Sequence, residues 1–179
     1  MDTISQTSDL EEEETDTNEM KGKFLTFWTD NQLFGIPIAD VVQIIGIQEI
    51  TPIPDSPAYA KGVINLRGNI IPVIDVRLRF SKEETSYNER TCIIVTQIDD
   101  NLIGFIVDSV DEVTTIEDNN ITPPPRVSKE RTNAYLSGIG KLKNKVVLLL
   151  DTDKILNAEE IEIVSSAVEN LAKEEGKKS

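Results

Sequence analysis

The segment DNQLFGIPIADVVQI at residues 30–44 recurs without a gap as DDNLIGFIVDSVDEV at residues 99–113. Four of the 15 aligned positions are identical, and four more place an apolar residue opposite an apolar residue. Two later matches keep the same order: residues 50–52 with 121–123, and residues 58–75 with 134–151. The offset between the copies grows from 69 to 71 to 76. Three collinear matches indicate an internal duplication with short insertions, in which each copy spans about 65 residues.

Apolar runs in each copy are short and are separated by turn sequences. Expected strands lie at residues 24–28, 33–38, 62–66, 69–74, 91–98 and 102–107. Asp30-Asn31 and Arg67-Gly68 are dipeptides that favour tight hairpin turns. The pattern predicts a mainly β chain of two tandem five-stranded barrels with short helices. The copies place the barrels at about residues 23–90 and 91–156, with an exchange of strands between them left open.

Local signals suggest where short helices begin. Residues 38–45, ended by Gly46, fit either a short helix or a bent strand. Asp75 and Asp151 each follow an apolar strand at equivalent places in the two copies. We expect each to cap the N-terminus of one helical turn. Two barrels in one chain share an interface and leave a groove where they meet, and such grooves favour partner binding.

The two ends of the chain differ in character. Residues 1–22 carry a net charge of −7 and almost no apolar side chains, which predicts a disordered acidic tail. Docking of this tail on a basic partner is the alternative. Asn157 and Glu160 fit a helix start, and apolar residues follow at spacings of three and four: Ile161, Val164, Val168 and Leu171. They predict an amphipathic helix at residues 157–175, with disorder at 176–179. We expect the helix to dock on the core, and binding to a partner is the alternative.

Composition excludes several classes of function. The chain of 179 residues has a formal charge of −14, no histidine and one cysteine, so it lacks His-dependent nucleophiles, a phosphate-accepting His and the usual zinc ligands. We expect no catalytic residues, no metal and no cofactor. Asp151 and Asp153 are the candidate pair for a divalent cation, although helix capping explains Asp151 better. An enzyme that uses carboxylates alone, such as a glycoside hydrolase, is the remaining catalytic alternative.

The expected compartment follows from the same composition. Phosphate backbones attract Lys and Arg, so an acidic chain is not expected to bind nucleic acid. No apolar run approaches the roughly 20 residues of a membrane span, and the first residues do not form a signal peptide. We expect a cytoplasmic protein without direct membrane insertion.

Residues 61–77 read KGVINLRGNIIPVIDVR, and this segment closely resembles the signature of the CheW-like chemotaxis coupling proteins. TPIP at residues 51–54 and FGIPI at residues 34–38 resemble that family too. The second half continues the resemblance through residues 104–113 and 135–138, so that it covers residues 23 to about 170. The resemblance implies two SH3-like barrels, in agreement with the duplication.

The resemblance also implies a function. Members of the family are non-enzymatic adaptors between the cytoplasmic signalling tip of chemoreceptors and the regulatory domain of the CheA histidine kinase. The receptor's helical hairpin lies along the groove between the barrels, and the kinase domain packs against a barrel end. The implied location is cytoplasmic, with recruitment to membrane-bound receptor arrays. A scaffold of a non-flagellar motility or developmental chemosensory pathway is the alternative.

Six positions of this chain correspond to receptor-side or kinase-side positions of the family: Val41, Gln43, Ile44, Arg67, Val110 and Val113. The duplication makes Val41 equivalent to Val110, and Ile44 to Val113. These apolar residues line the groove in one interpretation and belong to the core in the other. Arg67 lies at the tip of a tight turn, so we expect it to be exposed and paired with an acid on a partner or in the same chain. Gln43 stands where many family members have Glu, which removes the charge for a salt bridge there.

Overall fold

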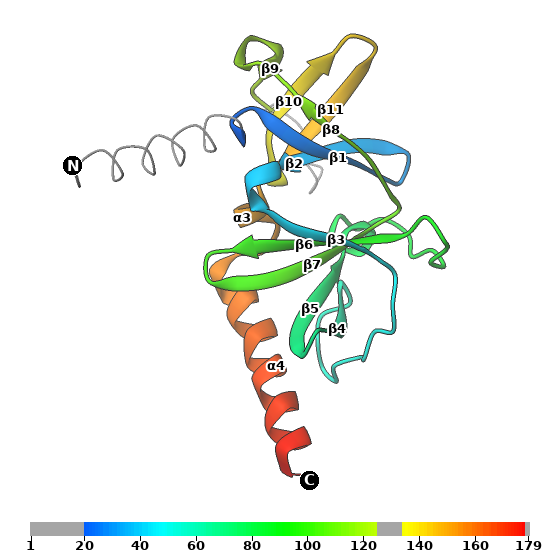
Figure 1. Cartoon of the computed structure of the whole chain (residues 1–179), viewed down its shortest axis with the longest axis vertical. Helices are drawn as coiled ribbons and strands as arrows, with labels where there is room; N and C mark the ends of the chain where they lie inside the picture. The colour runs from blue at the N-terminus through cyan, green and yellow to red at the C-terminus, as the bar shows by residue number, and fades with distance from the viewer. Residues whose placement is uncertain (1–19, 125–133, 178–179) are drawn as a thin grey trace, which may run out of the picture.

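Two curled sheets form the body of the computed structural model, which describes residues 20–124 and 134–177 (Figure 1). The first, called barrel I, has the order β8-β1-β2-β11-β10-β9. Its strands are β1 Lys23–Thr29, β2 Gln32–Pro37, β8 Ser109–Thr115, β9 Ile121–Thr122, β10 Leu136–Leu142 and β11 Lys145–Leu150. The expected acidic tail lies outside the described residues, except for residues 20–22.

The second sheet, called barrel II, has the order β3-β6-β7-β5-β4. Its strands are β3 Val41–Gly46, β4 Ala60–Leu66, β5 Asn69–Asp75, β6 Cys92–Ile98 and β7 Asn101–Val107. The helices are η1 Ile38–Asp40, α2 Val76–Arg79, η2 Asp118–Asn120, α3 Thr152–Ile155 and α4 Ala158–Lys177. The expected class, a mainly β chain with two small SH3-like barrels, is confirmed. The sixth strand of barrel I is the two-residue β9, and its counterpart in barrel II is a single bridge between Thr51 and Val63.

The two copies of the sequence exchange a hairpin. Strands β1 and β2 of the first copy lie between β8 and β11 of the second, while β6 and β7 of the second lie between β3 and β5 of the first. The barrels therefore do not coincide with residues 23–90 and 91–156. Each exchanged hairpin joins its new sheet through a parallel pair, β2 with β11 and β7 with β5.

A glycine stands at each of these parallel junctions. A Cβ on Gly35 would lie 3.1 Å from a methyl group of Leu149, and a Cβ on the equivalent Gly104 would lie 3.0 Å from a methyl group of Val73. Leu149 and Val73 are themselves equivalent, and each pairs in register with its glycine. The missing side chain lets the exchanged hairpin approach the strand of the other copy.

The two barrels share one apolar core. Its largest cluster takes Phe27 and Phe34 from barrel I and Ile94 and Phe105 from barrel II. The ring of Phe34 lies 5.9 Å from that of Phe27 and 5.4 Å from that of Phe80, which follows α2. The barrels are therefore joined by a continuous hydrophobic interior.

The local predictions for turns and caps are confirmed. Asp30 and Asn31 have φ angles of 52° and 60°, the left-handed conformation of a tight hairpin turn. Asp75 accepts a hydrogen bond from the Leu78 N–H at 3.2 Å, and Asp151 accepts one from the Asp153 N–H at 3.0 Å. The ambiguous residues 38–45 form both structures, with η1 followed directly by β3.

The C-terminal helix begins with a reciprocal cap. The Asn157 side chain accepts from the Glu160 N–H at 2.8 Å, and the Glu160 carboxylate accepts from the Asn157 N–H at 3.1 Å. Ile161 and Val164 are buried against the shared core, as expected for a docked helix. α4 continues to Lys177, two residues beyond the expected end. Among the described residues, no helix combines the length and apolar character needed to cross a bilayer.

Candidate functional site

The six positions singled out from the sequence fall on two strands and one turn. Val41, Gln43 and Ile44 lie on β3, Val110 and Val113 lie on β8, and Arg67 lies in the turn between β4 and β5. β3 is the edge strand of barrel II and β8 is the edge strand of barrel I. Edge strands expose backbone groups and side chains to partners. The two edges are therefore pseudo-equivalent candidate docking surfaces.

Both edge strands bulge at the same place. On β3, Val41 pairs with Thr96 and Gln43 pairs with Val95, so Val42 is the extra residue. Bulges redirect side chains locally and are common at sheet edges. Val42 is accordingly 54% exposed.

Thr26 on β1 holds the corresponding bulge of β8. Val110 pairs with Phe27 and Val113 pairs with Leu25, leaving two β8 residues opposite Thr26. The Thr26 hydroxyl donates to the Glu112 carbonyl at 2.8 Å and accepts from the Glu112 N–H at 3.1 Å. The buried hydroxyl thus satisfies the backbone groups that the bulge leaves unpaired.

Burial separates the apolar candidates into two pairs. Val41 and Val110 are half-buried and pack against the shared core. Ile44 is 41% exposed and Val113 is 51% exposed. The first pair therefore supports packing, whereas the second pair leaves apolar surface open to a partner.

The two edges differ in charge. Asp111 and Glu112 on β8 are joined to Lys145 on β11 at 3.2 and 3.5 Å. Their equivalents on β3 are the uncharged Val42 and Gln43. One chain therefore offers an acidic edge on barrel I and a neutral, more apolar edge on barrel II.

Arg67 is exposed with a φ of 54° at the tip of the β4–β5 hairpin. Of the two pairings expected for it, one with an acid of the same chain is not seen among the ion pairs of residues 20–124 and 134–177. Within the described part of the chain, its guanidinium therefore has no acidic partner.

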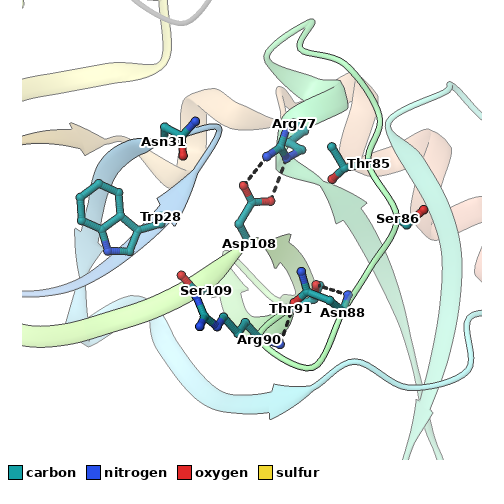
Figure 2. A pocket seen from close by; sticks show the side chains of 10 residues that line it. All are labelled: Trp28, Asn31, Arg77, Thr85, Ser86, Asn88, Arg90, Thr91, Asp108 and Ser109. Atoms are coloured by element: carbon teal, nitrogen blue, oxygen red, sulfur yellow. Dashed lines mark hydrogen bonds and ion pairs between the residues drawn. The ribbon is translucent and has the colours of Figure 1, made fainter.

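A cleft of about 540 Å³ lies where the barrels meet (Figure 2). Trp28 and Asn31 of barrel I line it together with Arg77 and Arg90 of barrel II, and Asp108 lies between them. Trp28 lines this cleft and is 37% exposed.

Arg77 and Asp108 are joined within the lining of the cleft (Figure 2). Arg77 Nε lies 2.8 Å from Asp108 Oδ1, and Arg77 Nη2 lies 2.6 Å from Asp108 Oδ2. Asp108 also accepts from the Asp30 N–H at 2.9 Å. Burial alone would raise the pKa of Asp108, but hydrogen bonds from Arg77 and the Asp30 N–H lower it below its usual value. The carboxylate thus stays charged and ties the β1–β2 turn to α2.

A second cluster anchors α4 to both barrels. The Arg79 guanidinium carbon lies 4.5 Å from the ring centroid of Tyr59 and 5.1 Å from that of its equivalent, Tyr135. Arg79 Nη2 also lies 2.8 Å from Glu160 Oε1, and the Tyr59 hydroxyl donates to Glu160 Oε2 at 2.6 Å. Burial and the hydrogen bond to Glu160 raise the pKa of Tyr59 to about 12.

The carboxylates that are candidates for catalysis or metal binding take part in a helix cap and in ion pairs. Within the described residues, no group of three or more Cys, Asp and Glu side chains is placed to hold a metal ion. Asp151 caps α3. Asp108, Asp111 and Glu112 lie in ion pairs with Arg77 and Lys145.

Sequence reasoning missed two exposed apolar residues, Val42 on β3 and Val146 on β11, which are 54% and 56% exposed. The stretch VVQII at residues 41–45 is apolar at four of five positions, so alternation could not tell which side chains face outward. The bulge that exposes Val42 depends on pairing with β6. Comparison of the two copies was the available signal, since Asp111 occupies the place of Val42.

Comparisons with known proteins agree with this architecture. The family model described as "CheW-like domain" matches residues 23–160. The chain is 36% identical over 151 residues to the chemotaxis protein CheW of Klebsiella aerogenes, covering 84% of this chain and 89% of that one. It is 26% identical over 136 residues to the protein FrzA of Myxococcus xanthus, covering 75% and 84%. It also resembles the crystal structure of the scaffolding protein TtCheW from Thermoanaerobacter tengcongensis, with a TM-score of 0.72, 35% identity and coverage of 78% and 94%.

Proposed function

This chain belongs to the CheW-like domain family, and on that premise we propose that it is a non-enzymatic adaptor coupling chemoreceptors to the CheA histidine kinase. A scaffolding role in chemotaxis is the general role of its relatives. The finer proposal concerns the partners: the cytoplasmic signalling tip of a receptor and the regulatory domain of the kinase.

The observation that carries the proposal is the pair of bulged edge strands with uncovered apolar side chains. Ile44 on β3 and Val113 on β8 are 41% and 51% exposed at equivalent positions. A receptor helix needs apolar contacts for affinity and a charge at the rim for orientation. Ile44 and Val113 each supply an apolar contact on one edge, and Arg67 supplies a cation that has no ion-pair partner among the described residues.

Two different edges suit an adaptor that must hold two partners. The β3 edge carries Val42 and Gln43, where the β8 edge carries Asp111 and Glu112. Since like charges placed opposite each other are costly, charge differences of this kind distinguish partners. We propose that receptor and kinase contacts include Val41, Gln43, Ile44, Arg67, Val110 and Val113. Recruitment to membrane-bound receptor arrays from the cytoplasm follows from such contacts.

The test measures binding to both proposed partners. The purified chain is mixed with a receptor signalling fragment and with the regulatory domain of the kinase, and amide chemical shifts are followed by NMR. We expect shifts on β3, on β8 and around Arg67. Ile44→Glu and Val113→Glu should weaken binding by about tenfold or more. Ile163→Glu is the matched control, since Ile163 on α4 is 51% exposed.

Two outcomes would overturn the proposal. One is the absence of binding to both fragments. The other is equal weakening by Ile163→Glu and by the edge-strand variants, which would show a general response to added charge. Thermal unfolding of each variant identifies any loss that comes from the fold.

A second candidate is a CheW-like scaffold of a non-flagellar motility or developmental chemosensory pathway. The similarity to the protein FrzA favours including it. The two candidates differ in the behaviour that the bound receptors control. Receptors that bind the tagged chain are purified from its own cells and then deleted. Loss of biased swimming supports flagellar chemotaxis, and unchanged swimming supports the second candidate.

A further inference from the structure

Helix α4 covers one face of barrel II. It packs against β5, and Ser165 and Val168 of α4 line a cavity of about 350 Å³ together with Ile70 and Leu102. Ile70 is half-buried there. The helix thus supplies an apolar cover for residues at the start of β5.

The duplication places an equivalent face on barrel I. The offset of 76 makes Ile70 equivalent to Val146, and the β4–β5 hairpin equivalent to β10–β11. No helix of the described chain covers this second face, since α4 packs on β5, and Val146 is 56% exposed. Figure 1 shows the two hairpins in different halves of the molecule, β10–β11 at the top and β4–β5 below.

The uncovered face is also basic. Lys141, Lys143 and Lys145 stand where the other hairpin has Asn65, Arg67 and Asn69. Lys145 points to the opposite side of β11 from Val146, since neighbouring strand residues alternate, and it is paired with Asp111. Lys141 and Lys143 are exposed, and neither belongs to an ion pair among the described residues. Lys141 pairs with Val146 in the register of β10 and β11, and Lys143 lies in the turn between these strands.

We propose that this basic hairpin face, made of Lys141, Lys143 and Val146, binds an acidic amphipathic helix of a protein partner. The helix occupies the place that α4 occupies on barrel II. α4 itself shows the required chemistry, because it presents Val168 toward Ile70 and carries acids beside its apolar positions. Lysines at the rim add electrostatic attraction for such a helix.

This inference goes beyond the proposed function, because the face is separate from β3 and from the Arg67 hairpin. It gives the adaptor a third point of attachment. If the receptor and kinase fragments do not bind, the proposal for the basic hairpin face still stands. If the helical peptide does not bind, the proposed contacts of β3 still stand.

The experiment uses the full chain and a synthetic peptide with the sequence of residues 158–177, held helical by a side-chain bridge between i and i+4 positions. Amide chemical shifts are followed as the peptide is added. We expect saturable shifts at residues 141–146 that weaken as salt increases. Lys143→Glu should weaken binding by about tenfold, and Val146→Glu should abolish it.

Matched controls keep the result specific. Lys154→Glu makes the same charge change at an exposed lysine of α3, and Ile163→Glu places the same acid at an exposed apolar residue of α4. Both controls should bind the peptide as the unmodified chain does. Shifts confined to β5 and α4, no saturable binding, or equal weakening by Lys143→Glu and Lys154→Glu would each overturn the proposal.

Discussion

Arg77 and Asp108 form a two-pronged ion pair across the junction of the barrels, with N–O distances of 2.8 and 2.6 Å. Arg77 belongs to α2, which follows the last strand of the first copy, whereas Asp108 lies where the chain leaves β7 for β8. The side chains are 17% and 31% exposed. The pair therefore fixes the point at which the chain passes from one barrel to the other.

Replacing one residue of this ion pair should lower the free energy of unfolding and leave the hydrophobic core intact. We expect Asp108→Asn to lower the free energy of unfolding by about 1–2 kcal/mol, since a charge-assisted, two-pronged contact is lost and Arg77 keeps a partly buried charge. Urea unfolding measures the change, and a double-mutant cycle with Arg77→Ala isolates the pair. A coupling energy near zero would show that the contact contributes nothing.

The same pair gives a pH dependence with a defined sign. The pKa of Asp108 is lowered in the folded state, so its contribution is present above the unfolded pKa of about 3.9 and is lost as pH falls through the folded value. The stability difference between the unmodified chain and Asp108→Asn should be constant above about pH 5 and shrink below about pH 4. A difference that grows on acidification would contradict this assignment.

Gly62 should tolerate no side chain. Its φ is 146°, and an added Cβ would lie 2.1 Å from the Thr51 carbonyl oxygen, in the bridge between Thr51 and Val63. We expect Gly62→Ala to cost about 3 kcal/mol or more. Gly46→Ala is the control, since nothing lies within 4 Å of a Cβ there. Thermal unfolding compares the two, and equal melting temperatures would refute the argument.

The anchor of α4 should depend on Glu160. Glu160→Gln removes the charge that meets Arg79 and weakens the acceptor of the Tyr59 hydroxyl. We expect faster hydrogen exchange in the first turns of α4, with the exchange of β6 and β7 unchanged. Glu162→Gln, on an exposed face of the same helix, is the comparison. Equal acceleration by both variants would assign the effect to helix charge and leave the anchor without support.

Sequence alone was sufficient where the signal is local. Asp30 and Asn31 specified a tight turn, Asp75 and Asp151 specified caps, and Asn157 with Glu160 specified the start of α4. In each case the physical cause acts within four residues. Such effects do not depend on which strand becomes a neighbour.

The exchange of hairpins could not be derived in that way. The repeat shows that Gly35 and Gly104 are equivalent, but either copy could have kept its own hairpin. The choice depends on long-range pairing, such as Phe34 beside Leu148. The candidate site was limited by the same problem, because Val42 and Ile44 are exposed only once β3 bulges at an edge.

The exchanged hairpins also set an order for assembly during synthesis. Strands β3 to β7 are contiguous, from Val41 to Val107, so all of barrel II has left the ribosome before β11 is made. Strands β1 and β2 are made first, yet their neighbours β8 and β11 are made only after all the strands of barrel II. Distant pairing of this kind slows folding. The first hairpin therefore completes its pairing only after the last strand has been made.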